Sequence, residues 1–193
     1  MKDTREKILE TAFALMLKNG VNGVSTGDIA KALGVARSLP YRYFATKREL
    51  VLESFKLFFC DRFFCSEAPL EKSLFSAIEF CEKTFRDIIE NMGKIIGEKV
   101  DVFAYNTLYI EALKHEPEFK EYTVMRSKLY KKCVLSAVKS GELRGDVDAE
   151  FVMRSLLDIF GRSCDVVTER SNRRNLENII GDMWRFYSLI KKT

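Results

Sequence analysis

Residues 25–44 combine basic, hydroxyl and aromatic side chains at spacings that suit contact with a nucleic acid. Two short helical patterns flank Gly34, as in a helix-turn-helix, whose second helix enters the major groove of DNA. Arg37 begins the second pattern, where its guanidinium could bind guanine O6 and N7 together. The residues that we expect to bind DNA are Thr26, Arg37, Ser38, Leu39, Tyr41, Tyr43 and Lys47.

These residue types favour different contacts. The Thr26 hydroxyl lies near a helix N-terminus, where it can donate to a phosphate with the helix dipole assisting. Tyr41, Tyr43 and Lys47 suit phosphate contacts, which set register rather than sequence, and Leu39 suits a thymine methyl group. A simpler interpretation stays open, in which Arg37 is a solvated helix charge and Tyr41 only packs against the protein.

The distribution of charge also favours a polyanion at this end of the chain. The 193 residues carry a net charge of +4, and residues 1–50 hold nine Lys or Arg against five Asp or Glu. The remaining residues are therefore neutral as a whole. A basic head on a neutral body is typical of a DNA-binding module joined to a second domain.

The elements that position these residues are all helical in pattern. Asp3 with Glu6, and Thr46 with Glu49, predict capping boxes, and Ser25 with Asp28 predicts the start of the first helix of the motif. Pro40 is tolerated only in a first helical turn, so the second helix of the motif should begin around Ala36 or Arg37 and run to Phe44.

The helix that Thr46 opens should be unusually long, reaching about Cys65, which suits a connection between two domains. Beyond Pro69 the apolar spacing predicts further helices, and no strand pattern is present. We expect an all-α protein with a helix-turn-helix domain at 1–47 and a helical ligand-sensing and dimerisation domain at 48–193. The helices predicted in the second domain span 71–91, 95–114, 117–139, 148–169 and 174–191, with Asp148 as the cap of the fourth.

Residues 4–55, including the Tyr-x-x-Phe pattern from Tyr41 to Phe44, resemble the DNA-binding domain of the TetR family of bacterial regulators. The resemblance implies an all-helical fold and DNA contacts from the seven residues named above. It also implies dimerisation through the last two helices, a C-terminal domain that often encloses a ligand, and repression of nearby genes. Gly27 departs from the family, whose members often carry a longer side chain there that sometimes reads a base.

Aromatic residues are abundant after the first domain, and we interpret some of them as the lining of an apolar pocket, although an aromatic stripe is more often core. Two apolar stripes near the C-terminus predict a four-helix dimer interface, the alternative being burial within one chain. The pocket candidates are Phe59, Phe63, Phe80, Phe103, Tyr105 and Tyr109. The interface candidates are Phe151, Ser155, Ile159, Phe160, Ile180, Met183, Trp184 and Tyr187.

Other classes of protein find little support. There is no phosphate-binding Gly-rich loop or nucleophile elbow, and His115, the single histidine, is expected in an exposed turn. The five cysteines form no Cys-x-x-Cys pair, so we expect reduced thiols, no metal and no cofactor. We expect a cytoplasmic protein without a membrane segment. It should be a homodimeric, sequence-specific regulator, a repressor that a small hydrophobic ligand releases from a palindromic operator on duplex DNA. The alternative is a helical protein-interaction scaffold.

Overall fold

The computed structural model describes residues 3–62, 73–100, 102–161 and 176–192. The regular structure in these ranges is helical, which confirms the predicted all-α class. The one β-type contact among them is an isolated bridge between Leu143 and Lys191, beside the end of the last helix. None of the helices in these ranges combines the length and the apolar character needed to cross a bilayer.

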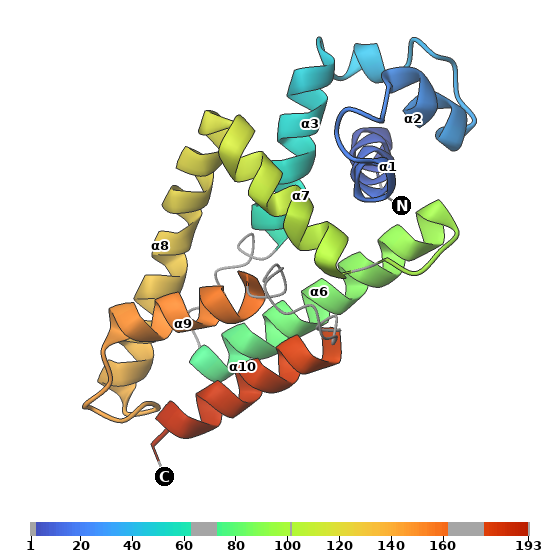
Figure 1. Ribbon diagram of the computed structural model, residues 1–193. Coiled ribbons are helices and arrows are strands. Elements are labelled where there is room, and N and C mark those ends of the chain that lie inside the picture. The colour runs from blue at the N-terminus through green and yellow to red at the C-terminus, as the bar shows by residue number, and fades with distance from the viewer. Residues whose placement is uncertain (1–2, 63–72, 101, 162–175, 193) are drawn as a thin grey trace.

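The head begins with α1 (Thr4–Asn19) and α2 (Thr26–Leu33), followed by a short 3-10 turn, η1 (Pro40–Arg42), and α3 (Lys47–Phe55) (Figure 1). The predicted capping box at the start of α2 is confirmed. The Ser25 hydroxyl accepts from the Asp28 amide, while the Asp28 carboxylate accepts from the Ser25 amide. Gly34 then ends α2 in the left-handed region, with φ of 67°.

The other two predicted capping boxes differ from expectation. Asp3 precedes α1 but makes no side-chain capping bond, and the Glu6 carboxylate, its predicted partner, accepts instead from Arg62 at 2.7 Å. At α3 the Thr46 hydroxyl accepts from the Glu49 amide at 3.1 Å, as predicted. The Glu49 carboxylate reaches one residue further back, to the Ala45 amide at 2.7 Å.

The second helix of the helix-turn-helix is shorter and tighter than we predicted. Backbone bonds over three residues join Leu39 to Ala36 and Arg42 to Leu39, and the regular turn spans only Pro40–Arg42. Pro40 explains the difference, because it has no N–H to give to the Ala36 carbonyl and its ring crowds that oxygen in an α-helix. The predicted helix from Ala36 or Arg37 to Phe44 is therefore a 3-10 turn flanked by hydrogen-bonded turns.

The predicted long helix from the head into the body is present as far as the structure describes it. α3 passes directly into η2 (Lys56–Asp61), a π-helical turn, and Arg62 is still helical. The π geometry was not predicted; such turns are rare and frequently lie at functional places in helices. The last residues of the predicted helix, 63–65, lie outside the described residues.

The body consists of α6 (Leu74–Ile96), α7 (Val102–His115), α8 (Pro117–Ser140), α9 (Ala149–Gly161) and α10 (Leu176–Ile190). The predictions for α8 and α10 agree within a few residues. α6 ends later than expected, at Gly97 with φ of 72°, so α7 begins about seven residues after its predicted start. Asp148 caps α9 by accepting from the Glu150 and Phe151 amides, and the predicted residues beyond 161 are not described.

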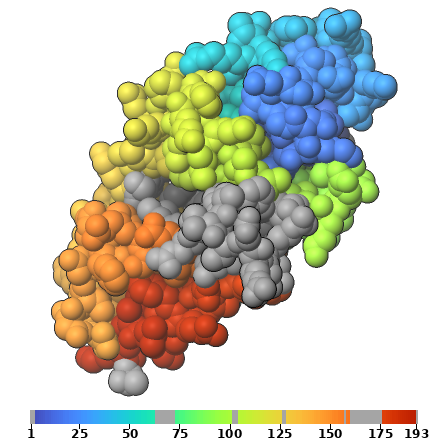
Figure 2. Space-filling model, in the orientation of Figure 1, coloured from blue at the N-terminus to red at the C-terminus, as the bar shows by residue number. Residues whose placement is uncertain are grey.

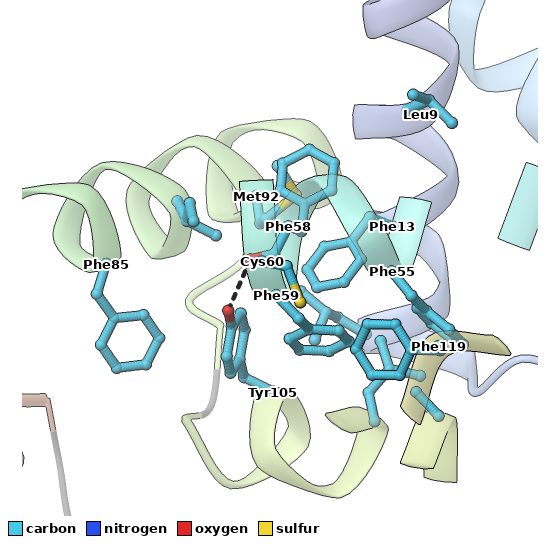
Figure 3. Close-up of a cluster of buried hydrophobic side chains, with 14 of the residues drawn as sticks. Leu9, Phe13, Phe55, Phe58, Phe59, Cys60, Phe85, Met92, Tyr105 and Phe119 are labelled. Carbon is cyan, nitrogen blue, oxygen red and sulfur yellow. Dashed lines mark hydrogen bonds between the residues drawn. The ribbon is translucent and has the colours of Figure 1, made fainter. Parts of the chain in front are cut away.

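Head and body share one hydrophobic core. The blue and cyan atoms of the head lie directly against the green and yellow-green atoms of the body helices (Figure 2). Phe13 of α1 stacks on Phe58 with ring centroids 4.5 Å apart and meets the edge of Tyr105 of α7 at 5.9 Å. Figure 3 shows this cluster, which also includes Phe55, Phe59 and Phe119. The core thus runs across the predicted boundary between residues 47 and 48.

Candidate nucleic-acid interface

The turn between α2 and α3 has buried side chains on its inner face and exposed side chains on its outer face. Pro40 and Phe44 are buried, the latter with 2% of its surface exposed, and Leu39 is half-buried. Arg37, Ser38 and Arg42 are exposed. Tyr41 and Tyr43 keep 53% and 39% of their surface exposed, which is high for tyrosines of a packed domain. The turn therefore presents basic, hydroxyl and phenol groups outward on a fixed apolar base.

Thr26 and Tyr41 were predicted as separate phosphate contacts, and the structure brings them together. The Thr26 hydroxyl and the Tyr41 hydroxyl lie 2.8 Å apart in a hydrogen bond. Thr26 is nearly buried, with 8% of its surface exposed. Because one hydroxyl of this pair can donate to the other, the second proton remains available to a phosphate oxygen. Thr26 thus holds the Tyr41 ring at the start of α2.

Lys47 has a structural partner that the sequence did not indicate. Its ammonium donates to the Val21 carbonyl at 3.0 Å, joining the first turn of α3 to the loop after α1. The side chain is half-buried. An ammonium has three donors, so this bond leaves Lys47 able to contact a phosphate as well.

The capping box at the start of α2 stabilises the ionised form of Asp28. The pKa of the Asp28 carboxyl is lowered, chiefly by the Ser25 hydroxyl and amide and further by the Lys31 and Arg37 charges. Lys31 and Arg42 are exposed cations that we did not select as DNA contacts. The position of Arg42, between Tyr41 and Tyr43, was a signal that could have identified it.

The candidate pocket residues lie in different surroundings. Phe59 and Tyr105 are buried in the aromatic core, their ring centroids 4.9 Å apart, and the Tyr105 hydroxyl donates to the Phe58 carbonyl at 3.0 Å. Burial raises the pKa of Tyr105, and burial with nearby Cys60 raises that of Tyr109 to about 12. Phe80 of α6 is half-buried. Phe63 and the side chain of Phe103 lie outside the described residues.

The candidate interface residues also divide. Ile180 and Met183 are buried within the single chain, with 5% and 1% of their surfaces exposed. Trp184 donates to Glu82 at 2.7 Å, and the Tyr187 hydroxyl donates to Glu142 at 3.0 Å, so both also have partners within the chain. Phe151 is 56% exposed. Ser155 and Ile159 are half-buried, and the side chain of Phe160 is not among those described.

The remaining groups that can bind metals or react are unremarkable in arrangement. Within the described ranges, no three His, Cys, Asp or Glu side chains are placed to hold a metal ion. Cys60, Cys81 and Cys133 are buried free thiols. Burial raises the pKa of the Cys81 thiol to about 12 and that of the Cys133 thiol to about 11, which keeps both protonated at neutral pH. His115 ends α7 and is exposed.

Comparison with known proteins places these observations in a family. Residues 8–54 match the model of "Bacterial regulatory proteins, tetR family". The chain is 41% identical over 56 residues to the HTH-type transcriptional regulator AcrR of Shigella flexneri, covering 29% of this chain and 26% of AcrR. It is 24% identical over 164 residues to the HTH-type transcriptional repressor KstR2 of Rhodococcus jostii (strain RHA1), covering 80% of this chain and 74% of that protein.

Solved structures share the whole fold at low sequence identity. The ketosteroid transcriptional regulator KstR2 of Mycobacterium tuberculosis aligns with a TM-score of 0.64 and 17% identity, covering 100% of this chain and 97% of that one. A regulator from Saccharomonospora viridis in complex with choline aligns with a TM-score of 0.60 and 20% identity, covering 98% of both chains. Residues 8–54 of the head therefore carry the domain of the tetR family of bacterial regulatory proteins, and the chain as a whole shares its fold with solved transcriptional regulators.

Proposed function

We propose that this regulator is a homodimeric repressor that binds a palindromic operator and is released by a small hydrophobic ligand. The observation that carries the DNA-binding part is the exposed group of Arg37, Ser38, Tyr41, Arg42 and Tyr43 on a buried base. Packing alone does not require so many exposed phenols and guanidiniums on one short turn. They match the donors that proteins place against phosphates and base edges.

Within this surface we assign the reading of bases to Arg37 and Ser38, with Leu39 toward a thymine methyl group. Tyr41, supported by Thr26, and Tyr43 and Lys47 contact phosphates. Arg42 joins them as a phosphate contact. The functional division at residues 47 and 48 is part of the same proposal, with residues 1–47 binding DNA and 48–193 sensing and dimerising.

Dimerisation follows from the small size of one head, which can contact too few bases for specific binding alone. Exposed apolar side chains on the last two described helices support it, since Phe151 of α9 and Leu189 of α10 are 56% and 65% exposed. Apolar groups of that size are commonly covered by a partner when they cluster. We place the interface on the outer faces of α9 and α10.

The ligand proposal rests on the aromatic contacts that connect the body helices to the head. The aromatic cluster joins α1 of the head to α7 and α8 of the body through the π-helical turn. A ligand held among the body helices would shift this cluster and thereby the separation of two heads, provided that it binds one arrangement more tightly. KstR2 is named for ketosteroids and the Saccharomonospora regulator is in complex with choline. These are different chemistries, and we commit only to an apolar ligand.

The decisive experiment is selection of bound duplexes from a random pool, followed by affinity measurements on the selected site. Arg37→Ala should cost about 1–3 kcal/mol and relax preference at one position in each half-site. Lys47→Ala should weaken binding to all sequences and reduce the salt slope by about one. Lys139→Ala, which removes an exposed cation of α8, is the control and should change neither quantity. A wild-type protein that selects no sequence would favour the helical scaffold.

The dimer and the ligand have separate tests. Phe151→Asp should convert the dimer to a monomer in sedimentation, whereas Val124→Asp, at a site that is also 56% exposed, should leave it intact. A wild-type monomer at micromolar concentration would contradict the dimer. For the ligand, sterols, fatty acids and aromatic acids are titrated against the preformed DNA complex, and release by one class without unfolding is the expected result.

A further inference from the structure

Gly27, the second residue of α2, lies directly beneath the Arg37 side chain. A β-carbon at position 27 would lie 3.3 Å from Arg37 Nε and 3.7 Å from Arg37 Cζ. The first distance is shorter than an ordinary van der Waals contact between carbon and nitrogen. A side chain at position 27 would therefore require the Arg37 side chain to move by a few tenths of an ångström.

The backbone does not explain the glycine. The described glycines with positive φ are Gly20, Gly34, Gly97 and Gly141, and Gly27 is not among them. Within a helix, glycine is a poorer choice than alanine, because it loses more conformational freedom on folding. The observable consequence of Gly27 is the room that it leaves for the guanidinium.

The surroundings of Gly27 are fixed except for Arg37. The Ser25 amide and hydroxyl donate to Asp28 Oδ2 at 2.8 and 2.6 Å, and the Asp28 amide donates back to the Ser25 hydroxyl at 3.2 Å. These hydrogen bonds fix the positions of Ser25 and Asp28 near Gly27. A side chain at position 27 would be accommodated by movement of the flexible arginine rather than of the capped helix.

The guanidinium of Arg37 lies beside the first turn of α2. Arg37 contributes with Gly27 and Asp28 to the lining of a surface hollow of about 380 Å³ between α2 and the turn that follows it. The Asp28 carboxylate owes its lowered pKa chiefly to the Ser25 hydrogen bonds, and the charge of Arg37 makes the smallest contribution. Arg37 thus contacts the first turn of α2 as well as its own turn.

We propose that Gly27 is a positioning residue for Arg37 and so determines base preference without touching a base. Because residue 27 has no side chain, the Arg37 guanidinium can lie against α2. This position sets the direction from which the planar group approaches a base edge. Bidentate hydrogen bonding to a base depends on that direction. The inference rests on the proposed DNA-binding function and adds to it the residue that orients the reader.

The test compares wild type, Gly27→Ala, Arg37→Ala and the double variant by selection from a random duplex pool and by affinity at one fixed salt concentration. Arg37→Ala should lower preference at its position by about 5- to 150-fold. Gly27→Ala should lower preference at the same position by about three- to tenfold and leave binding to non-specific duplex unchanged. In the Arg37→Ala background, Gly27→Ala should have no further effect.

Folding is controlled in the same experiment. Alanine is the better helix former, so Gly27→Ala should melt no lower than wild type, and a loss of preference cannot then come from unfolding. Gly145→Ala, which adds a β-carbon where no atom lies within 4 Å, should leave the preference unchanged.

Two results would overturn the inference: an unchanged preference in Gly27→Ala, or an effect of equal size with and without Arg37. Selection of no sequence by the wild type would instead refute the proposed function, so the two failures can be distinguished.

Discussion

The reading surface (Arg37, Ser38, Tyr41, Arg42 and Tyr43) and the junction between head and body hold their side chains in opposite ways. At the reading surface the side chains are exposed. At the junction, Phe13, Phe55 and Phe58 are at most 1% exposed. α1 contacts α6 and α7 of the body and also α2 and α3 of the head. Under the proposed function, the buried junction would fix the orientation of the head, and the exposed surface would determine which DNA sequence it binds.

The sharpest test of this contrast is removal of a junction aromatic ring. Phe13→Ala should reduce the free energy of unfolding by about 3–5 kcal/mol, because a fully buried ring is replaced by a cavity. Chemical denaturation measures the loss. Phe75→Ala removes a ring that is 45% exposed and should cost far less. Similar losses for the two variants would mean that the junction is not a rigid support.

A second test concerns the ion pairs beside the aromatic cluster. The Arg62 guanidinium donates to Glu6 and Glu10 of α1, each at 2.7 Å, and lies 4.7 Å from the centre of the Phe58 ring. The Glu10 side chain is only 6% exposed. Arg62→Ala would leave that carboxylate largely buried with fewer donors, at a cost of about 1–3 kcal/mol.

The matched control is an ion pair away from the junction. Lys94 and Glu90 pair within α6, with side chains 69% and 67% exposed. Lys94→Ala should change the free energy of unfolding by less than about 0.5 kcal/mol, because water screens such pairs. Equal effects of Arg62→Ala and Lys94→Ala would remove the distinction between the junction and an ordinary surface.

The smallest expected effect is a dependence of stability on pH at the start of α2, beside the reading surface. The pKa of Asp28 is lowered in the folded protein, so its contribution to stability is present at neutral pH and is lost as acid protonates the carboxylate. Asp28→Asn should therefore melt below wild type at pH 7, with the difference shrinking as the pH falls below the ordinary aspartate value. Thermal melts of both proteins from neutral to strongly acidic pH measure it, and a difference that grows in acid would contradict the assignment.

Much of the candidate site followed from the sequence because its signals are local. Ser25 with Asp28, Thr46 with Glu49, and the glycine at 34 each act over a few residues, and the structure places caps or turns at all three. Two predictions were wrong because another interaction or a neighbouring residue overrides the expected local one. Glu6 is bound by Arg62 rather than closing the box at Asp3, and Pro40 converts a predicted α-helix into a 3-10 turn.

By itself, the sequence determined the all-helical class, the position of the helix-turn-helix and the likeness of the head to the tetR-family domain, since these depend on periodicity, caps and a contiguous motif. Only the tertiary structure decided which partners the side chains find. Thr26 meets Tyr41, Lys47 meets the Val21 carbonyl, and Glu142 accepts from the Leu74 and Phe75 amides at the start of α6. An apolar stripe likewise does not state what covers it, and Met183 is buried within its own chain. Such contacts join residues far apart in the sequence, and their energies depend on how the helices pack rather than on local spacing.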